Sequence, residues 1–106
     1  PCAAFYCDRI DIEFAGKGIG LELLIADAQS RRLLEKCLVS SSPDGTPACG
    51  GSNPVALSGA SERLTVLALR GDAVAFQRTY EPEVIEAPEC GCRVARVLVD
   101  LTDDAQ

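Results

Sequence analysis

A chain of 106 residues with 16 acidic and 10 basic side chains, and a net charge of −6, restricts both domain number and partners. The length suits one domain over residues 1–106 and is too short for two independent cores. The acidic balance leaves no dense Lys/Arg surface of the kind that phosphate backbones and anionic lipids attract, so we expect no nucleic-acid partner. Apolar runs fall short of the roughly 18 to 20 residues that cross a bilayer, so membrane insertion is not expected.

The first regular stretch, residues 8–14, alternates apolar and charged side chains with a period of two. Ile10, Ile12 and Phe14 share one side, and charged residues occupy the other. This alternation predicts a half-buried β-strand. The closely spaced glycines of 16–18 predict the turn that follows it, because glycine adopts the positive φ that tight turns use.

Residues 20–36 have two interpretations. Their apolar residues fit one stripe of a helix, and the segment is rich in good helix formers, which would give an α+β fold with one helix near residues 20–36. The other interpretation is two strands joined by a turn near Ala28-Gln29-Ser30. We favour the strands, which require Leu33, Cys37 and Val39 to face the core.

The middle of the chain contains a long loop and short strands. Ser, Pro, Gly and Asn are dense in residues 40–54, which predicts a loop. Residues 55–57 predict a short edge strand, and Pro54 fits an edge because it cannot donate to a ladder. Residues 63–70 are rich in β-formers and predict a further strand, with a turn at Gly71-Asp72.

The last part of the chain predicts two more stretches of strand. Residues 73–85 form a strand or two half-strands bent at Pro82, and residues 93–101 form the closing strand. The side chains expected on one side of the closing strand are Val97, Val99 and Leu101. Six or seven strands at a spacing of roughly ten residues predict a mainly β fold, a small antiparallel β-sandwich stabilised by disulfides.

Several segments of the second half resemble a known domain type. They are Leu57-Ser-Gly-Ala-Ser-Glu-Arg63, Leu64-Thr-Val-Leu-Ala-Leu-Arg70 with Gly71, Cys90-Gly-Cys92 and Val97-Leu-Val-Asp-Leu101. Together they resemble bacterial secreted or lipoprotein domains of the carboxypeptidase-regulatory, transthyretin-like type. The resemblance implies a sandwich with an accessory, non-enzymatic role, and it names no ligand.

Six cysteines in so short a chain predict disulfides and therefore an oxidising compartment, so we expect a secreted or cell-surface protein. The loop between Cys37 and Cys49 is a natural span for a local disulfide. A bond between Cys90 and Cys92 would be strained, because only one residue separates them. On a strand these two cysteines share a face, so we expect each to reach a separate partner in the N-terminal segment. Those partners are Cys2 and Cys7.

Other uses of the cysteines fit the surrounding residues less well than disulfides do. A redox-active Cys-Gly-Cys lacks a neighbouring His or Lys to lower the thiol pKa. The spacing of Cys2, Cys7, Cys90 and Cys92 fits no common zinc module. The chain opens with Pro1-Cys2-Ala3, which we expect to be a mature or trimmed form. A lipid anchor on Cys2 is the weaker alternative, because a preceding proline suits signal peptidase poorly.

The remaining residues point away from catalysis. The sequence has no histidine, which excludes Ser-His-Asp and Cys-His hydrolases. The acidic clusters lack the Asp-x-Asp-x-Asp-Gly pattern of calcium loops, so we expect neither metal nor cofactor. We expect a non-enzymatic extracytoplasmic structural or interaction module, as an accessory domain of a surface protein or a subunit of an extracellular assembly such as a fibre. Edge strands are the expected contact with a protein partner or with further copies. A small-ligand or carbohydrate-binding module is the alternative.

Overall fold

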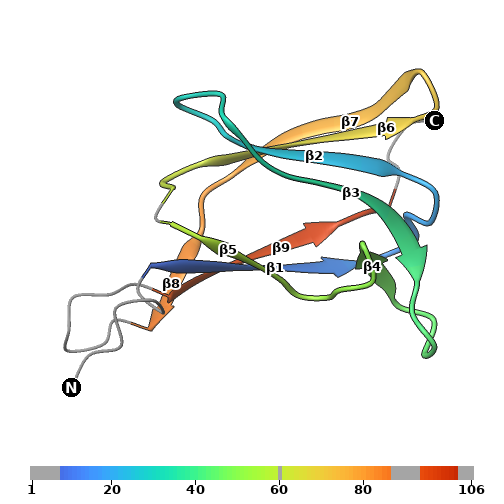
Figure 1. Ribbon diagram of the computed structural model, residues 1–106, viewed down its shortest axis with the longest axis horizontal. Helices are drawn as coiled ribbons and strands as arrows, with labels where there is room; N and C mark the ends of the chain where they lie inside the picture. The colour runs from blue at the N-terminus through green and yellow to red at the C-terminus, as the bar shows by residue number, and fades with distance from the viewer. Residues whose placement is uncertain (1–7, 60, 87–93, 103–106) are drawn as a thin grey trace.

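The computed structural model describes residues 8–59, 61–86 and 94–102, which form two β-sheets packed face to face (Figure 1). This confirms the predicted β-sandwich. The described residues contain no helix, and so none long and apolar enough to cross a bilayer. The strands are β1 (Arg9–Ala15), β2 (Glu22–Asp27), β3 (Leu33–Ser41), β4 (Pro47–Cys49), β5 (Val55–Ser58), β6 (Leu64–Arg70), β7 (Ala73–Tyr80), β8 (Glu83–Glu86) and β9 (Val94–Asp100).

One sheet has the strand order β5-β1-β9-β8 and the other has the order β4-β3-β2-β6-β7. Neighbouring strands are antiparallel except for β1 and β9, which run parallel from Arg9↔Val94 to Ala15↔Asp100. The sequence predicted an antiparallel sandwich, so the parallel pairing of β1 with β9 differs from that prediction. A hairpin turn forces its two strands to be antiparallel, but β1 and β9 are linked through the whole domain and are free of that constraint.

The core lies between the sheets and is built from the alternation seen in the sequence. Ile10, Ile12 and Phe14 of β1 are buried, as predicted. The predicted row at the end of the chain is also confirmed: Val97, Val99 and Leu101 are 4%, 0% and 0% exposed. The connection from β1 to β2 packs closely on this row. A Cβ atom at Gly18 would lie 2.5 Å from the Cβ of Leu101, so only glycine fits there.

Residues 20–36 form strands, not a helix, so the α+β alternative is wrong. The β2–β3 hairpin has its turn at residues 28–32. Val39 is buried and Cys37 is half-buried, as the strand interpretation required, but Leu33 is 53% exposed. The register of β2 and β3 shifts between Ile25 and Ala26, which moves the start of β3 onto the outer face.

The residues that the structure describes form nine strands instead of six or seven, because two segments each contain one strand more than counted. The predicted loop contains β4, whose three residues are buried and pair with the end of β3. That end of β3 curves towards the four-stranded sheet and brings β4 near β1 (Figure 1). Residues 73–85 form two strands separated at Pro82, as the second of the two alternatives predicted, but in different sheets: β7 pairs with β6, whereas β8 pairs with β9.

Candidate interaction surface

The outer face of the five-stranded sheet carries a group of hydrophobic side chains. The register places Leu24 beside Leu67 and Leu69 beside Val74, all on the side that faces away from the core. Three members of the group are more than half exposed, at 53% to 61%, and the others are half-buried. We call this group the apolar sheet face; its members are Leu24, Leu33, Leu38, Leu67, Leu69 and Val74.

The apolar sheet face carries little charge. Its central rows include one acid and one base, Glu22 and Lys36, whose side chains approach to 3.8 Å (Lys36 Nζ to Glu22 Oε2). Threonines of β6 and β7 lie opposite each other at one end of the sheet, with their hydroxyl oxygens 3.4 Å apart. The face is therefore close to neutral in a chain whose net charge is −6.

The outer face of the four-stranded sheet has the opposite character. On β1, Arg9 and Asp11 form an ion pair (Nε to Oδ1, 3.0 Å). Glu13 pairs with Arg96 of the neighbouring strand β9 (Oε2 to Nε, 3.4 Å). Leu98 is the exposed hydrophobic exception on this side, at 62%. Only the four-stranded sheet thus has the usual pattern of one buried apolar face and one polar face in contact with water.

The apolar sheet face has a signal in the sequence, within residues that also predict a strand. Residues 21–26 and 64–69 are almost continuously apolar, which is typical of strands covered on both faces. These runs are the central strands β2 and β6. Their inner residues are in the core, and within the described part of the chain nothing covers their outer residues.

A shallow depression of about 480 Å³ lies at the β2–β3 turn end of this face. Leu24, Leu33 and Leu67 contribute to its lining, with Arg31 and Asp27 at its rim. The pKa of Asp27 is lowered, mainly because the Ser30 backbone N–H and then its hydroxyl donate hydrogen bonds to the carboxylate. The lining of the depression contains no aromatic side chain, so the depression lacks the flat platform on which sugars stack.

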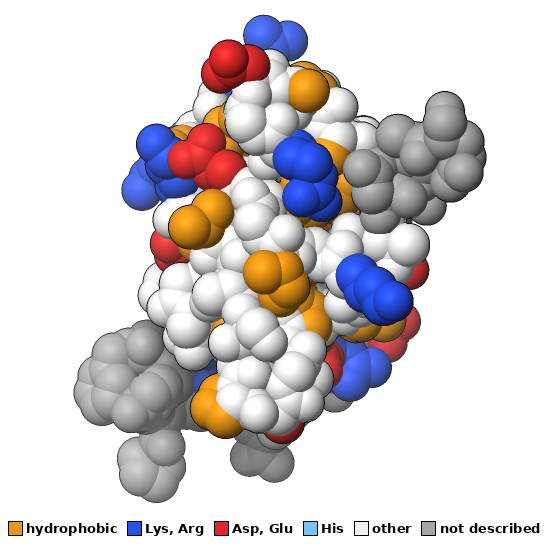
Figure 2. All heavy atoms as spheres, turned by 90° about the vertical axis from the view of Figure 1, so that its right-hand side faces the viewer, with side chains coloured by type: hydrophobic (Ala, Val, Ile, Leu, Met, Phe, Trp, Pro, Cys, Tyr) orange, Lys and Arg blue, Asp and Glu red, His pale blue; other side chains and the backbone are white. Residues whose placement is uncertain are grey.

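Hydrophobic side chains are more dispersed at the end of the sandwich that carries the β6–β7 turn. Figure 2 looks onto that end and shows single orange side chains separated by Lys, Arg and backbone. Isolated exposed hydrophobic residues are normal on a protein surface, whereas a contiguous group marks a contact surface. The apolar sheet face is therefore the better candidate site.

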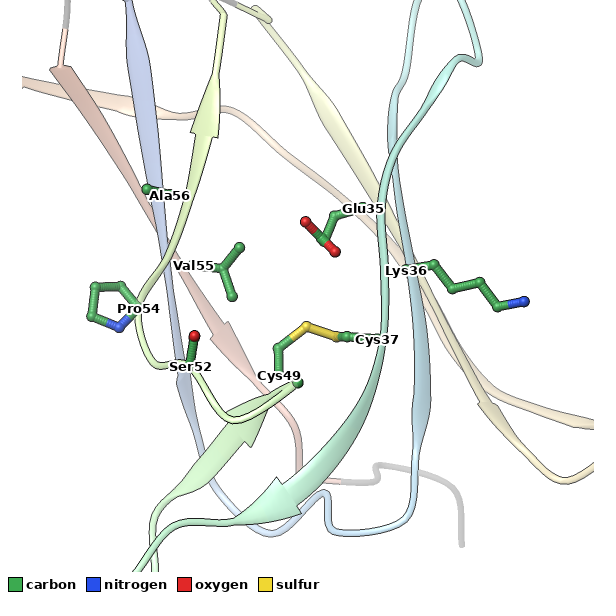
Figure 3. Close-up of a pocket in the computed structure, with 9 residues that line it drawn as sticks. Glu35, Lys36, Cys37, Cys49, Ser52, Pro54, Val55 and Ala56 are labelled. Carbon is green, nitrogen blue, oxygen red and sulfur yellow. A yellow bond between two sulfur atoms is a disulfide. The ribbon is translucent and has the colours of Figure 1, made fainter. Parts of the chain in front are cut away.

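A second hollow, of about 490 Å³, lies between β3 and β5 at one open side of the sandwich (Figure 3). Glu35 and Val55 point into it from opposite strands, while Lys36 points away. The Cys37–Cys49 disulfide crosses its lower end and joins the middle of β3 to the end of β4, with 5.3 Å between the Cα atoms. An inward carboxylate and a neighbouring lysine are features that keep strand edges from pairing with other chains, so we interpret this hollow as a protected edge.

The predicted cysteine pairs can be followed only in part. Cys37 and Cys49 form the expected disulfide, which is typical of an oxidising environment. The proposed partners Cys2, Cys7, Cys90 and Cys92 lie outside the described residues. In residues 8–59, 61–86 and 94–102, no group of His, Cys, Asp or Glu side chains could hold a metal ion.

Sequence reasoning missed one polar residue with a clear structural role. Asn53 lies opposite Phe14, two positions beyond the last β1–β5 pair, Ile12↔Val55. Its side-chain amide replaces a strand partner: Oδ1 accepts from Phe14 N–H (3.0 Å), and Nδ2 donates to Phe14 O (2.9 Å). Nδ2 also donates to Pro47 O (2.9 Å), which ties β4 to β1.

The turn between β3 and β4 is held by a second polar cluster. The carboxylate of Asp44 accepts hydrogen bonds from the hydroxyls of Ser42 and Thr46 and from the Thr46 backbone N–H. These bonds, that of Ser42 first, lower the pKa of Asp44 to about 2. Each donor is used within the turn, so the cluster is structural.

Comparisons with models of known families, with curated proteins and with solved structures find no match for this chain. The resemblance to transthyretin-like domains therefore stays a prediction.

Proposed function

We propose that this domain is a non-enzymatic structural and interaction module that docks onto another protein through the apolar sheet face. The observation that carries the proposal is that β2 and β6 are apolar on both sides, although the described chain covers only one side. Strands of this kind are normally buried on both faces. A protein partner would supply the missing layer.

Covering this face would supply part of the free energy that binding needs. Burying a whole Leu or Val side chain stabilises a complex by about 1.5–3 kcal/mol. Leu33, Leu38 and Val74 are each more than half exposed. Their burial would therefore contribute roughly 3–5 kcal/mol in total, before any contribution from the half-buried leucines. Burying the Glu22–Lys36 pair would offset part of this gain, because an ion pair loses its hydration inside an interface.

We further propose that the module works outside the cytoplasm, secreted or at the cell surface. The Cys37–Cys49 disulfide supports this location, because disulfides persist in oxidising compartments. An accessory domain of a surface protein and a subunit of an extracellular assembly both fit a docking face of this kind.

Site-specific photo-cross-linking in the native host tests the proposal. A photoreactive amino acid at Leu67, in the centre of the apolar sheet face, should yield a discrete adduct with a protein. The matched control places it at Leu98, which is exposed on the opposite sheet, and should yield no such adduct. Equal labelling at both positions, or none at Leu67, would refute the proposed docking face.

The alternative function, binding of a small ligand or carbohydrate, is supported by the depression beside Leu24 and Leu33. Its shallow, non-aromatic lining suits a flat protein surface better. A sugar or other small molecule that raises the melting temperature of the wild type, but not of an Ala26→Trp variant that fills the depression, would favour this alternative.

A further inference from the structure

The free strand edges of the sandwich are protected unequally. β5 and β8 have four residues each and follow Pro54 and Pro82. β4 has three residues and begins with Pro47, and the part of β3 that it leaves uncovered carries Glu35 and Lys36. Short length, proline and charge are the features by which edge strands avoid pairing with other chains.

β7 has neither the short length nor the proline of the other edges, and its protections are the inward-pointing Arg78 and a bulge at Ala75, where its register with β6 shifts. It is eight residues long, contains no proline, and pairs only with β6 among the described strands. Its single charged residue, Arg78, lies opposite the buried Val66 on the inner side. There the guanidinium donates to Asp100 O (2.7 Å) and lies 4.1 Å from the centre of the Phe76 ring. The outer side of β7 carries only uncharged residues, Val74, Gln77 and Thr79.

The hydrogen-bond pattern identifies which backbone groups of β7 are free. Ala28 N–H donates to Arg63 O, which fixes the alternation of bonded pairs between β2 and β6. By that alternation Val66 and Ala68 direct their backbone groups at β7, where they meet Arg78 and Phe76. Gln77 lies between Phe76 and Arg78, and Thr79 follows Arg78. These two residues direct their backbone N–H and C=O groups away from β6, towards the open edge of the sheet.

We propose that β7 pairs antiparallel with β7 of a second copy, about a twofold axis at Gln77. The inference rests on the proposed interaction role and names the partner. An antiparallel edge is self-complementary, because each strand offers donors and acceptors in the order that its symmetry mate requires. The alternative centre at Arg78 would put two arginines directly opposite each other, which is unfavourable. Centring on Gln77 instead places each Arg78 opposite Phe76 of the other copy.

Charge also favours this edge as the place of contact between identical chains. Each copy carries a net charge of −6, so copies repel over most of their surface. The outer side of β7 and the apolar sheet face beside it are close to neutral. Pairing there joins the two five-stranded sheets into one continuous sheet and extends the apolar sheet face across both copies.

Complementary substitutions at the twofold axis test the pairing. Sedimentation of the wild type, from micromolar to millimolar concentration, should show a monomer–dimer equilibrium. Gln77→Lys and Gln77→Glu each place like charges opposite each other, and each should raise the dimer dissociation constant about tenfold. An equimolar mixture of the two variants should form heterodimers at least as tightly as the wild type.

The matched control is Ser58→Lys on the free edge of β5, which should leave dimerisation unchanged. Thermal melts of all variants confirm that each remains folded. A wild type that stays monomeric at millimolar concentration refutes the proposal, as do open-ended polymers or a mixture of the Gln77 variants that fails to associate. None of these outcomes changes the cross-linking result at Leu67, so the docking role is tested separately.

Discussion

Replacing Asn53 by alanine should destabilise the domain by about 2 kcal/mol. The substitution removes three hydrogen bonds, two to the backbone of Phe14 and one to Pro47 O. A hydrogen bond contributes a net ~1 kcal/mol on average, which sets an upper value near 3 kcal/mol. The site is only partly buried, so water replaces some of the lost bonds and reduces the effect.

Urea unfolding at neutral pH measures this difference by linear extrapolation. The Cys37–Cys49 disulfide is kept intact by omitting any reducing agent. The folded variant should retain its two sheets, because Asn53 lies beyond the last β1–β5 pair. A free energy of unfolding within about 0.5 kcal/mol of the wild type would refute the view that this amide acts as a strand partner.

Asn53→Asp gives a second, pH-dependent test of the same bonds. The introduced carboxylate can still accept from Phe14 N–H, but it faces the carbonyl oxygens of Phe14 and Pro47 without a hydrogen to donate. These oxygens raise its folded-state pKa above the unfolded value of about 3.9. The folded state then binds the proton more tightly than the unfolded state does. The stability of Asn53→Asp relative to Asn53→Ala should therefore rise as the pH falls from the folded-state pKa to about 3.9, and this gain is lost as the pH rises above the folded-state pKa. A difference between the two variants that is independent of pH would contradict this account.

Three further predictions concern the disulfide, the core and the β3–β4 turn. Replacing Cys37 and Cys49 together by alanine should cost about 3 kcal/mol, the chain-entropy value for their separation of 12 residues; an unchanged urea midpoint would contradict this. Leu23→Ala, at a side chain with 0% exposure, should cost about 3 kcal/mol in urea unfolding, whereas Leu98→Ala, at 62% exposure, should cost less than about 0.5 kcal/mol. Because the pKa of Asp44 is lowered from 3.8 to about 2, its ionised form stabilises the fold above pH 3.8 and that contribution is lost between pH 3.8 and about 2. Urea midpoints over this window should therefore fall less steeply for Asp44→Asn than for the wild type, and identical slopes would contradict the role of the turn.

Features encoded by neighbouring residues were predictable from the sequence. The alternation around Ile10 and Ile12 identified a strand and its buried side, and the row that ends at Leu101 did the same for the last strand. The cysteines at the two ends of the central loop identified a disulfide. In each case the deciding interaction is local, or depends only on which side of a strand is apolar.

The candidate site was harder to predict from the sequence than the strands were, because it is defined by a sheet face on which no other described element packs. Leu24 and Leu67 look like core residues in the sequence, and only the sheet register shows that they face away from the core. Asn53 looked like ordinary loop chemistry, since its partner Phe14 is 39 residues away.

Local sequence patterns were enough to show that this chain forms strands, which side of the first and last strands is buried, and where Cys37 and Cys49 close a loop. The tertiary structure decided the order of the strands, the parallel pairing of β1 with β9, and the separation of β7 from β8 into different sheets. The physical reason is that a period of two specifies the faces of a strand but not its neighbours. Neighbours are chosen by packing between distant segments, and that choice leaves one edge and one apolar face open to a partner.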